Sequence, residues 1–101
     1  MQFCPSVYEH AASLIGKTPW EVSRDAGLLS KAHIEAYRLY RHRPVVVGID
    51  IYNLEAEAYG AVVSRAAGNA IPAIREYPCS SVKELLSLEP FDPKTAGRIP
   101  M

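Results

Sequence analysis

The pattern of apolar and polar positions divides the chain into a helical first part and a mixed second part. Apolar residues recur at helical spacing over residues 5–15, which predicts a first helix that ends at Gly16. A second helical pattern covers residues 18–41, with a bend predicted at residues 25–27. We therefore expect residues 1–43 to form a helical segment.

Two helix starts carry the same capping signature. In each, a hydroxyl side chain that can accept from a backbone N–H is followed three residues later by glutamate: Thr18 with Glu21, and Ser81 with Glu84. The first pair opens the second helix. The second pair predicts a short helix that ends by Leu88.

Residues 44–53 have a different pattern. Residues 45–49 are apolar without polar alternation, which is typical of a strand buried on both faces in a parallel sheet. Such a strand needs parallel neighbours, and the sequence contains no second run of this kind. Further along, residues 54–59 predict a short helix. Residues 61–64 and 71–74 then predict an irregular hairpin, with the proline-containing second strand at a sheet edge.

Composition excludes several classes of partner. Eleven basic and eleven acidic residues cancel, so we expect no electrostatic attraction of the whole chain to nucleic acid or to an anionic membrane. No apolar run approaches the ~20 residues of a membrane-spanning helix, and the first residues lack the pattern of a secretory signal. Cys4 and Cys79 predict free thiols, which fits a cytoplasmic protein.

Asp50 is the candidate catalytic residue. A carboxylate directly after a buried parallel strand lies where α/β barrels and open α/β sheets hold their active sites. The strand would hold it rigidly beside a cleft, and its ionised oxygens could collect N–H donors or stabilise a developing cation. Two structural roles stay open: a cap for the turn at residues 51–53, or a partner for an arginine. Tyr52, Asn53 and His10 are the candidates for substrate binding.

Other charged residues are expected to have structural roles. Glu55 and Glu57 are expected on a solvated helix face, and the basic run at residues 38–43 at a solvated helix end, with an anion site as the alternative. Signatures of phosphate loops, close histidine and cysteine clusters, and serine-hydrolase elbows are absent from the sequence. We therefore expect no metal site and no cofactor in this segment.

Four pieces of the sequence, in their order and spacing, resemble a known family. They are GIDIYN at residues 48–53, EAEAYG at 55–60, GNAIP at 68–72 and SVKEL at 81–85. Together they are similar to the uroporphyrinogen decarboxylase superfamily, which also contains cobalamin-dependent methyltransferases. The resemblance runs from about residue 5 to residue 101 and covers only the N-terminal part of a family member.

The resemblance implies an α/β fold of the (β/α)8 TIM-barrel type. Residues 1–101 would be its incomplete N-terminal part: two N-terminal helices, the first barrel strand at residues 45–49, a short hairpin and short helices. Asp50 would lie at the barrel mouth. The matching aspartate of the decarboxylases receives the pyrrole N–H groups of a tetrapyrrole and stabilises the protonated intermediate formed as an acetate side chain loses CO₂. That branch needs no cofactor.

The methyltransferase branch implies other partners. There a zinc-bound thiol accepts a methyl group from a corrinoid protein, and the zinc ligands would lie outside this segment. Residues 13–20 depart from the decarboxylase pattern, because they lack the pair of arginines that binds substrate carboxylates, which favours the methyltransferase-like side. The expected substrate is accordingly a tetrapyrrole or a methylated corrinoid.

A function of another class remains open. The chain could be a standalone, non-catalytic α/β interaction module that covers its strand edges by self-association, for instance as a homodimer. In the barrel interpretation the isolated 101-residue chain is expected to turn over no substrate, because a barrel mouth needs loops from several strands.

Overall fold

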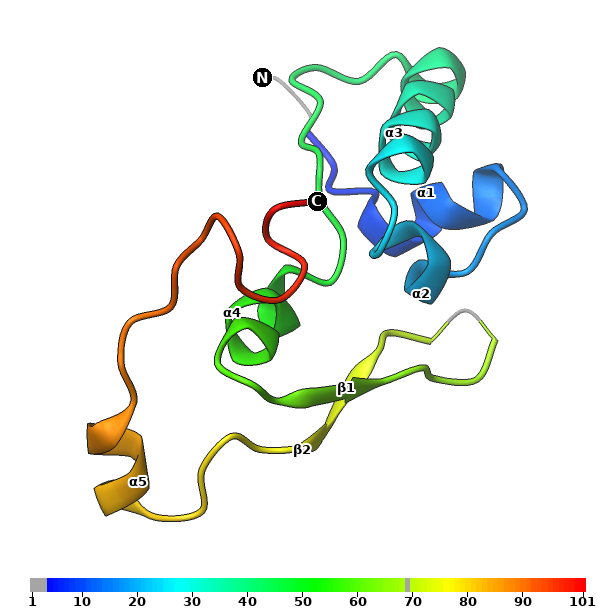
Figure 1. Ribbon diagram of the computed structural model, residues 1–101. Helices are drawn as coiled ribbons and strands as arrows, with labels where there is room; N and C mark the ends of the chain where they lie inside the picture. The colour runs from blue at the N-terminus through cyan, green and yellow to red at the C-terminus, as the bar shows by residue number, and fades with distance from the viewer. Residues whose placement is uncertain (1–3, 69) are drawn as a thin grey trace.

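The computed structural model describes residues 4–68 and 70–101, without the side chains of residues 51 and 52. The elements within these ranges are α1 (Tyr8–Leu14), α2 (Pro19–Val22), α3 (Ala26–Tyr40), α4 (Ile51–Ala58), β1 (Val62–Ser64), β2 (Ala73–Glu76) and α5 (Val82–Ser87). Figure 1 shows α1, α2 and α3 grouped together, the hairpin β1–β2 below α4, and α5 apart from the other elements.

A small core joins the three N-terminal helices. Its buried members are mostly alanines: Ala11, Ala12, Val22, Ala32, Ala36 and Ile49. Alanines at facing positions let the helices approach closely, but each removes little apolar surface from water, at about 25 cal/mol per Å². The core is therefore tight and energetically modest, which is usual for a domain of this size.

Local capping determines where the helices begin. Thr18 Oγ1 accepts from the backbone N–H of Glu21 at 3.3 Å and donates to Glu21 Oε1 at 3.2 Å, which confirms Thr18 as the N-cap. Asp25 Oδ1 accepts from the N–H of Leu28 at 2.9 Å and starts α3, so the predicted bend is confirmed. Ser81 Oγ accepts from the N–H of Glu84 at 3.2 Å, which confirms Ser81 as the N-cap, and the Glu84 carboxylate accepts from the N–H of Ser80 at 2.7 Å.

Residues 45–49 are not a strand in this structure, contrary to the prediction. The described sheet contains only β1 and β2. Burial on both faces was also wrong, because Val47 is 58% exposed whereas Ile49 is 5% exposed and joins the helical core. The physical reason is that a strand requires a hydrogen-bonded neighbour. Within residues 45–49, the backbone of Gly48 contacts a side chain: its N–H and C=O lie 3.2 and 3.0 Å from Nε2 of the buried His33.

The hairpin is confirmed with a shift in its second strand. β1 pairs antiparallel with β2, with Val63 opposite Ile74, and the register is irregular between Val62 and Val63. The second strand begins at Ala73 rather than at residue 71. Pro72, which has no N–H to donate, therefore lies just outside the paired segment.

The chain is more open than a compact domain of its length. Its radius of gyration is 15.5 Å, whereas a compact domain of 100 residues has about 13 Å. α5 buries no residue, and its Leu86 is 80% exposed. None of the helices formed by the described residues combines the length and the apolar character needed to cross a membrane.

Candidate functional site

Asp50 ends the extended segment and directly precedes α4. Its backbone adopts the left-handed conformation, with φ 49° and ψ 38°. Residues other than glycine rarely adopt this conformation, although aspartate tolerates it better than most, and it is often found at functional sites. The residue is only 1% exposed. Asp50 thus has a fixed position directly after residues 45–49. It was predicted to be open to a cleft, but in the structure it is enclosed.

Both carboxylate oxygens of Asp50 have a partner. Asn53 Nδ2 donates to Oδ1 at 2.6 Å, and Arg98 Nη2 donates to Oδ2 at 2.8 Å. The same Arg98 nitrogen also donates to the Asp50 carbonyl oxygen at 3.0 Å. Asn53 Nδ2 reaches the Pro72 carbonyl oxygen at 2.9 Å as well and so ties α4 to the start of β2. Of the two structural roles left open for Asp50, the structure shows the arginine partner and no side-chain cap.

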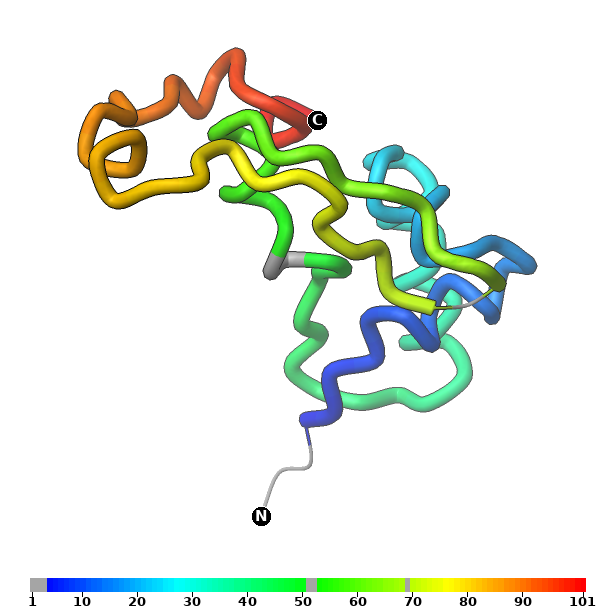
Figure 2. Tube along the Cα trace, turned by 90° about the horizontal axis from the view of Figure 1, so that it is seen from below, coloured from blue at the N-terminus to red at the C-terminus, as the bar shows by residue number. Residues whose placement is uncertain are grey.

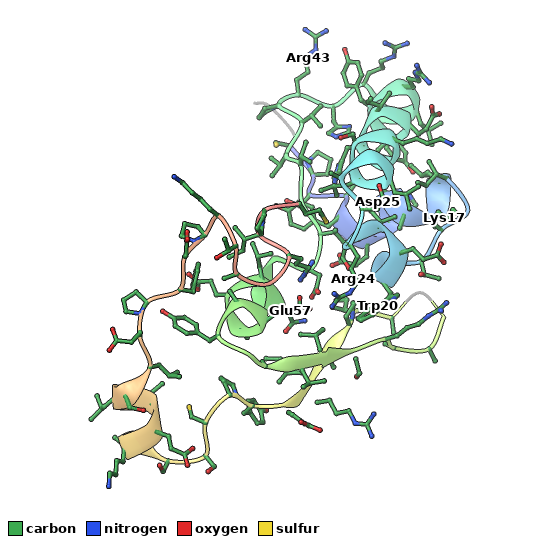
Figure 3. The ribbon with its side chains drawn as sticks, in the orientation of Figure 1. Lys17, Trp20, Arg24, Asp25, Arg43 and Glu57 are labelled. Carbon is green, nitrogen blue, oxygen red and sulfur yellow. The ribbon has the colours of Figure 1, made fainter. Side chains whose placement is uncertain are left out.

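A second carboxylate extends this contact into a network of two acidic and two basic residues. Glu57 Oε2 accepts from Arg98 Nε at 2.7 Å, and its Oε1 accepts from Arg24 Nη2 at 2.7 Å. The Arg24 guanidinium lies 4.0 Å from the centre of the Trp20 ring, and Figure 3 shows Arg24, which follows α2, on the side of α2 where Glu57 of α4 lies. We call Asp50, Arg98, Glu57 and Arg24 the ion-pair network.

Glu57 corrects a prediction. Its side chain is 17% exposed and salt-bridged to two arginines, so the expectation of a solvated Glu57 was wrong, whereas Glu55 is exposed as predicted. The signal was present in the spacing, because Asn53 and Glu57 are four residues apart and share one face of α4, and Asn53 in turn contacts Asp50. The pairing with Arg98 had no such signal.

Gly97 lets Arg98 reach the network. Its φ is +53°, and a Cβ atom built there would lie 3.2 Å from the Cα and the N of Ala58. A side chain at this position would therefore push the backbone off α4. Figures 1 and 2 both show the C-terminal residues running beside α4. Arg98 Nη1 also donates to the Ser23 carbonyl oxygen at 2.8 Å, so one guanidinium joins α4 to the end of α2.

The electrostatics of Asp50 reflect its burial. Removal from water raises the pKa of Asp50 above its ordinary 3.8, and the Arg98 guanidinium and the Asn53 hydrogen bond oppose that rise. The charge of Glu57 raises the pKa further, and Arg24 lowers it. The carboxylate is thus a fixed acceptor whose protonation state depends on the guanidinium beside it.

A small cavity borders the network. Its volume is about 220 Å³, below the ~300–1,000 Å³ of typical small-molecule sites. It is lined by Ser23, Leu29, Gly48, Ile49, Leu54, Arg98, Ile99 and Met101. Arg98 is among the lining residues, whereas Asp50 is not.

The structure groups only some of the predicted site residues. Asn53 contacts Asp50 directly. His10 lies elsewhere, with its Nε2 2.6 Å from the hydroxyl of Tyr40. The side chain of Tyr52 lies outside the described part of the structure. Within the described ranges, no group of histidine, cysteine, aspartate and glutamate is arranged to hold a metal ion.

Comparison of the chain with protein-family models, with curated proteins and with solved structures gave no match. The functional argument therefore rests on the geometry of the residues themselves.

Replacing Arg98 by alanine should lower the free energy of unfolding by about 3 kcal/mol, because it leaves the buried Asp50 without its cation. Urea denaturation followed by circular dichroism measures this. The matched control is Arg38→Ala, which breaks an exposed pair with Glu35 and should cost less than about 0.5 kcal/mol. Equal losses in the two variants would show that the network adds nothing beyond a surface ion pair.

Asp50 should also give the chain a distinct pH dependence. Because its folded pKa is raised above 3.8, its contribution to stability is fully present below that pH and is lost as pH rises through the raised pKa. Asp50→Asn removes this titration. The unfolding free energy of the wild type, relative to Asp50→Asn, should fall as the pH rises above 3.8. A difference that is constant or rises over this range would contradict the raised pKa.

Proposed function

We propose that the chain is the N-terminal part of a uroporphyrinogen decarboxylase-like barrel enzyme, with Asp50 at its active site. The reaction is methyl transfer from a methylated corrinoid or decarboxylation of a tetrapyrrole. The observation that carries the proposal is the placement of Asp50. Its carboxylate is buried, its backbone has the left-handed conformation, and it follows an apolar segment, residues 45–49, that has no strand partner among the described residues. Zinc and a corrinoid protein would be required only in the methyltransferase form.

The contacts of Asp50 support an acceptor role. Its Oδ1 is fixed by Asn53, while its Oδ2 accepts from Arg98 Nη2 at 2.8 Å. A substrate N–H would have to take the position that this guanidinium nitrogen holds. In the proposed enzyme Arg98 thus keeps the carboxylate oriented until the substrate donor replaces it, so that little reorganisation is needed in the reaction.

The uncovered apolar surface also supports a larger barrel. Val45 and Val47 are 37% and 58% exposed on a segment that has no strand partner among the described residues. Parallel strands are normally covered on both faces. Neighbouring barrel strands would pair with this backbone and bury these side chains, and they would supply the other loops of the barrel mouth.

The test is Asp50→Asn in the complete gene product that contains this chain. CO₂ release from uroporphyrinogen and methyl transfer from methylcobalamin to a thiol are measured in parallel. We expect one activity in the wild type and a loss of about 100-fold or more in the variant, as for removal of a fixed electrostatic group. Glu89→Gln, at an exposed position, is the matched control and should retain activity. Unchanged turnover in Asp50→Asn, or neither activity in the wild type, would overturn the proposal.

A second candidate function is self-association as a non-catalytic module. The observation that favours it is the same exposed segment together with α5, where Val82 and Leu86 are 71% and 80% exposed. Pairing of two copies along residues 45–49 would cover both the backbone and the side chains. A chain that sediments as a cooperatively folded monomer at micromolar concentration would exclude this candidate.

A further inference from the structure

The stretch that follows α5 has few attachments to the other described elements. None of residues 89–97 is buried, and Figure 1 shows this stretch returning alone from α5 to α4. Its backbone hydrogen bonds are local, such as the one from the Ala96 N–H to the Asp92 carbonyl oxygen at 2.9 Å. Among the described hydrogen bonds, those that join residues 89–101 to other parts of the chain all come from Arg98.

We call residues 96–101 the strap, and Arg98 is its polar anchor. The Arg98 side chain is only 8% exposed, and it donates to two carboxylates and two backbone carbonyl oxygens. Hydrogen bonds between charged groups are stronger than those between neutral groups. Ile99 and Met101 add apolar contact, because both line the cavity of about 220 Å³ beside the network.

The carboxylates that receive Arg98 are held by other partners as well. Asn53 Nδ2 donates to Asp50 Oδ1 at 2.6 Å, and Arg24 Nη2 donates to Glu57 Oε1 at 2.7 Å. Neither contact involves the strap. Departure of Arg98 would therefore leave both carboxylates in place, with one oxygen of each free for water. Opening of the strap does not require α4 to unfold.

The backbone of the strap touches α4 at one point. Gly97 packs on Ala58 so closely that a Cβ built on Gly97 would lie 3.2 Å from the Ala58 nitrogen and Cα. Earlier in the stretch, the rings of Phe91 and Tyr59 meet edge to face, with 5.0 Å between their centres. Residues 92–95, between these two contacts, are exposed and can act as a hinge.

We propose that the strap opens as a unit while α1, α2, α3 and α4 stay folded, and that this opening controls access to Asp50. In the closed form Asp50 is 1% exposed, because Arg98 occupies the free side of its carboxylate. In the open form Asp50 Oδ2 and Glu57 Oε2 face solvent and can accept from an incoming donor. The opening is a property of the 101-residue chain and does not rest on the function proposed for Asp50.

The test follows exchange of the Arg98 Nε–H with water in the wild-type chain by ¹H–¹⁵N NMR. This proton is bonded to Glu57 Oε2, so it should be better protected than that of Arg38, which is exposed as predicted for the basic run. Urea should change the Arg98 protection little, because opening exposes little surface. It should steeply lower the protection of the Ala36 amide, which is fully buried in α3 and requires unfolding.

Two glycine-to-alanine variants separate strap opening from unfolding. Gly97→Ala destabilises only the closed strap, so the Arg98 protection should fall about tenfold, as expected for alanine in the left-handed conformation. Gly16→Ala is the matched control, since Gly16 has φ +68° but a Cβ there meets nothing within 4 Å. It destabilises the end of α1 equally with the strap open or closed. It should therefore lower the Ala36 protection and leave the Arg98 protection unchanged.

Chemical labelling measures the access to Asp50 directly. Carbodiimide-mediated coupling of glycinamide to Asp50 should be about tenfold faster in Gly97→Ala than in the wild type, in proportion to the open population. Coupling at Glu89, which is exposed in the closed form, should be the same in both chains.

Four results would each overturn the proposal. The first is an Arg98 protection that falls with urea in parallel with that of Ala36, and the second is a protection no higher than that of Arg38. The third is an Arg98 protection that Gly97→Ala leaves unchanged. The fourth is an Asp50 coupling rate that does not differ between Gly97→Ala and the wild type.

Discussion

The contact between Arg98 and Asp50 is the interaction on which the arrangement of the second half of the chain depends. One guanidinium bonds to a carboxylate of Asp50, a carboxylate of Glu57 and the carbonyl oxygen of Ser23. Burying these charges is costly, and their mutual attraction offsets that cost only when the geometry is good and the remaining polar atoms are satisfied. Here two carboxylates and two guanidinium groups balance, which allows α4, the end of α2 and the C-terminal residues to meet without an excess of charge.

Local features of the fold could be predicted from the sequence, and features that depend on distant partners could not. The helix caps at Thr18 and Ser81 were correct because every atom involved lies within four residues. The hairpin was correct in kind and shifted in its second strand, since Pro72 limits where pairing begins. Residues 45–49 have the composition of a buried strand, but whether they form one depends on a neighbour. Arg98 was missed because nothing in its local sequence connects it to Asp50.

The uncovered segment at residues 45–49 and the ion-pair network lie side by side in the sequence but differ in exposure. The segment exposes the apolar side chains of Val45 and Val47, which suits pairing with another strand. Asp50, the next residue after the segment, is 1% exposed and is enclosed by its own partners.

The network also constrains the order in which the chain can fold. Arg98 is separated from Glu57, Asp50 and Ser23 by 41, 48 and 75 residues. Contacts across such distances form only after the intervening loops are closed, so they come late compared with α1, α2 and α3. Until then the two carboxylates beside α4 remain hydrated and without Arg98. During synthesis, the N-terminal helices can therefore assemble well before the ribosome has released Arg98, and the ion-pair network is completed only when the residue after Gly97 arrives.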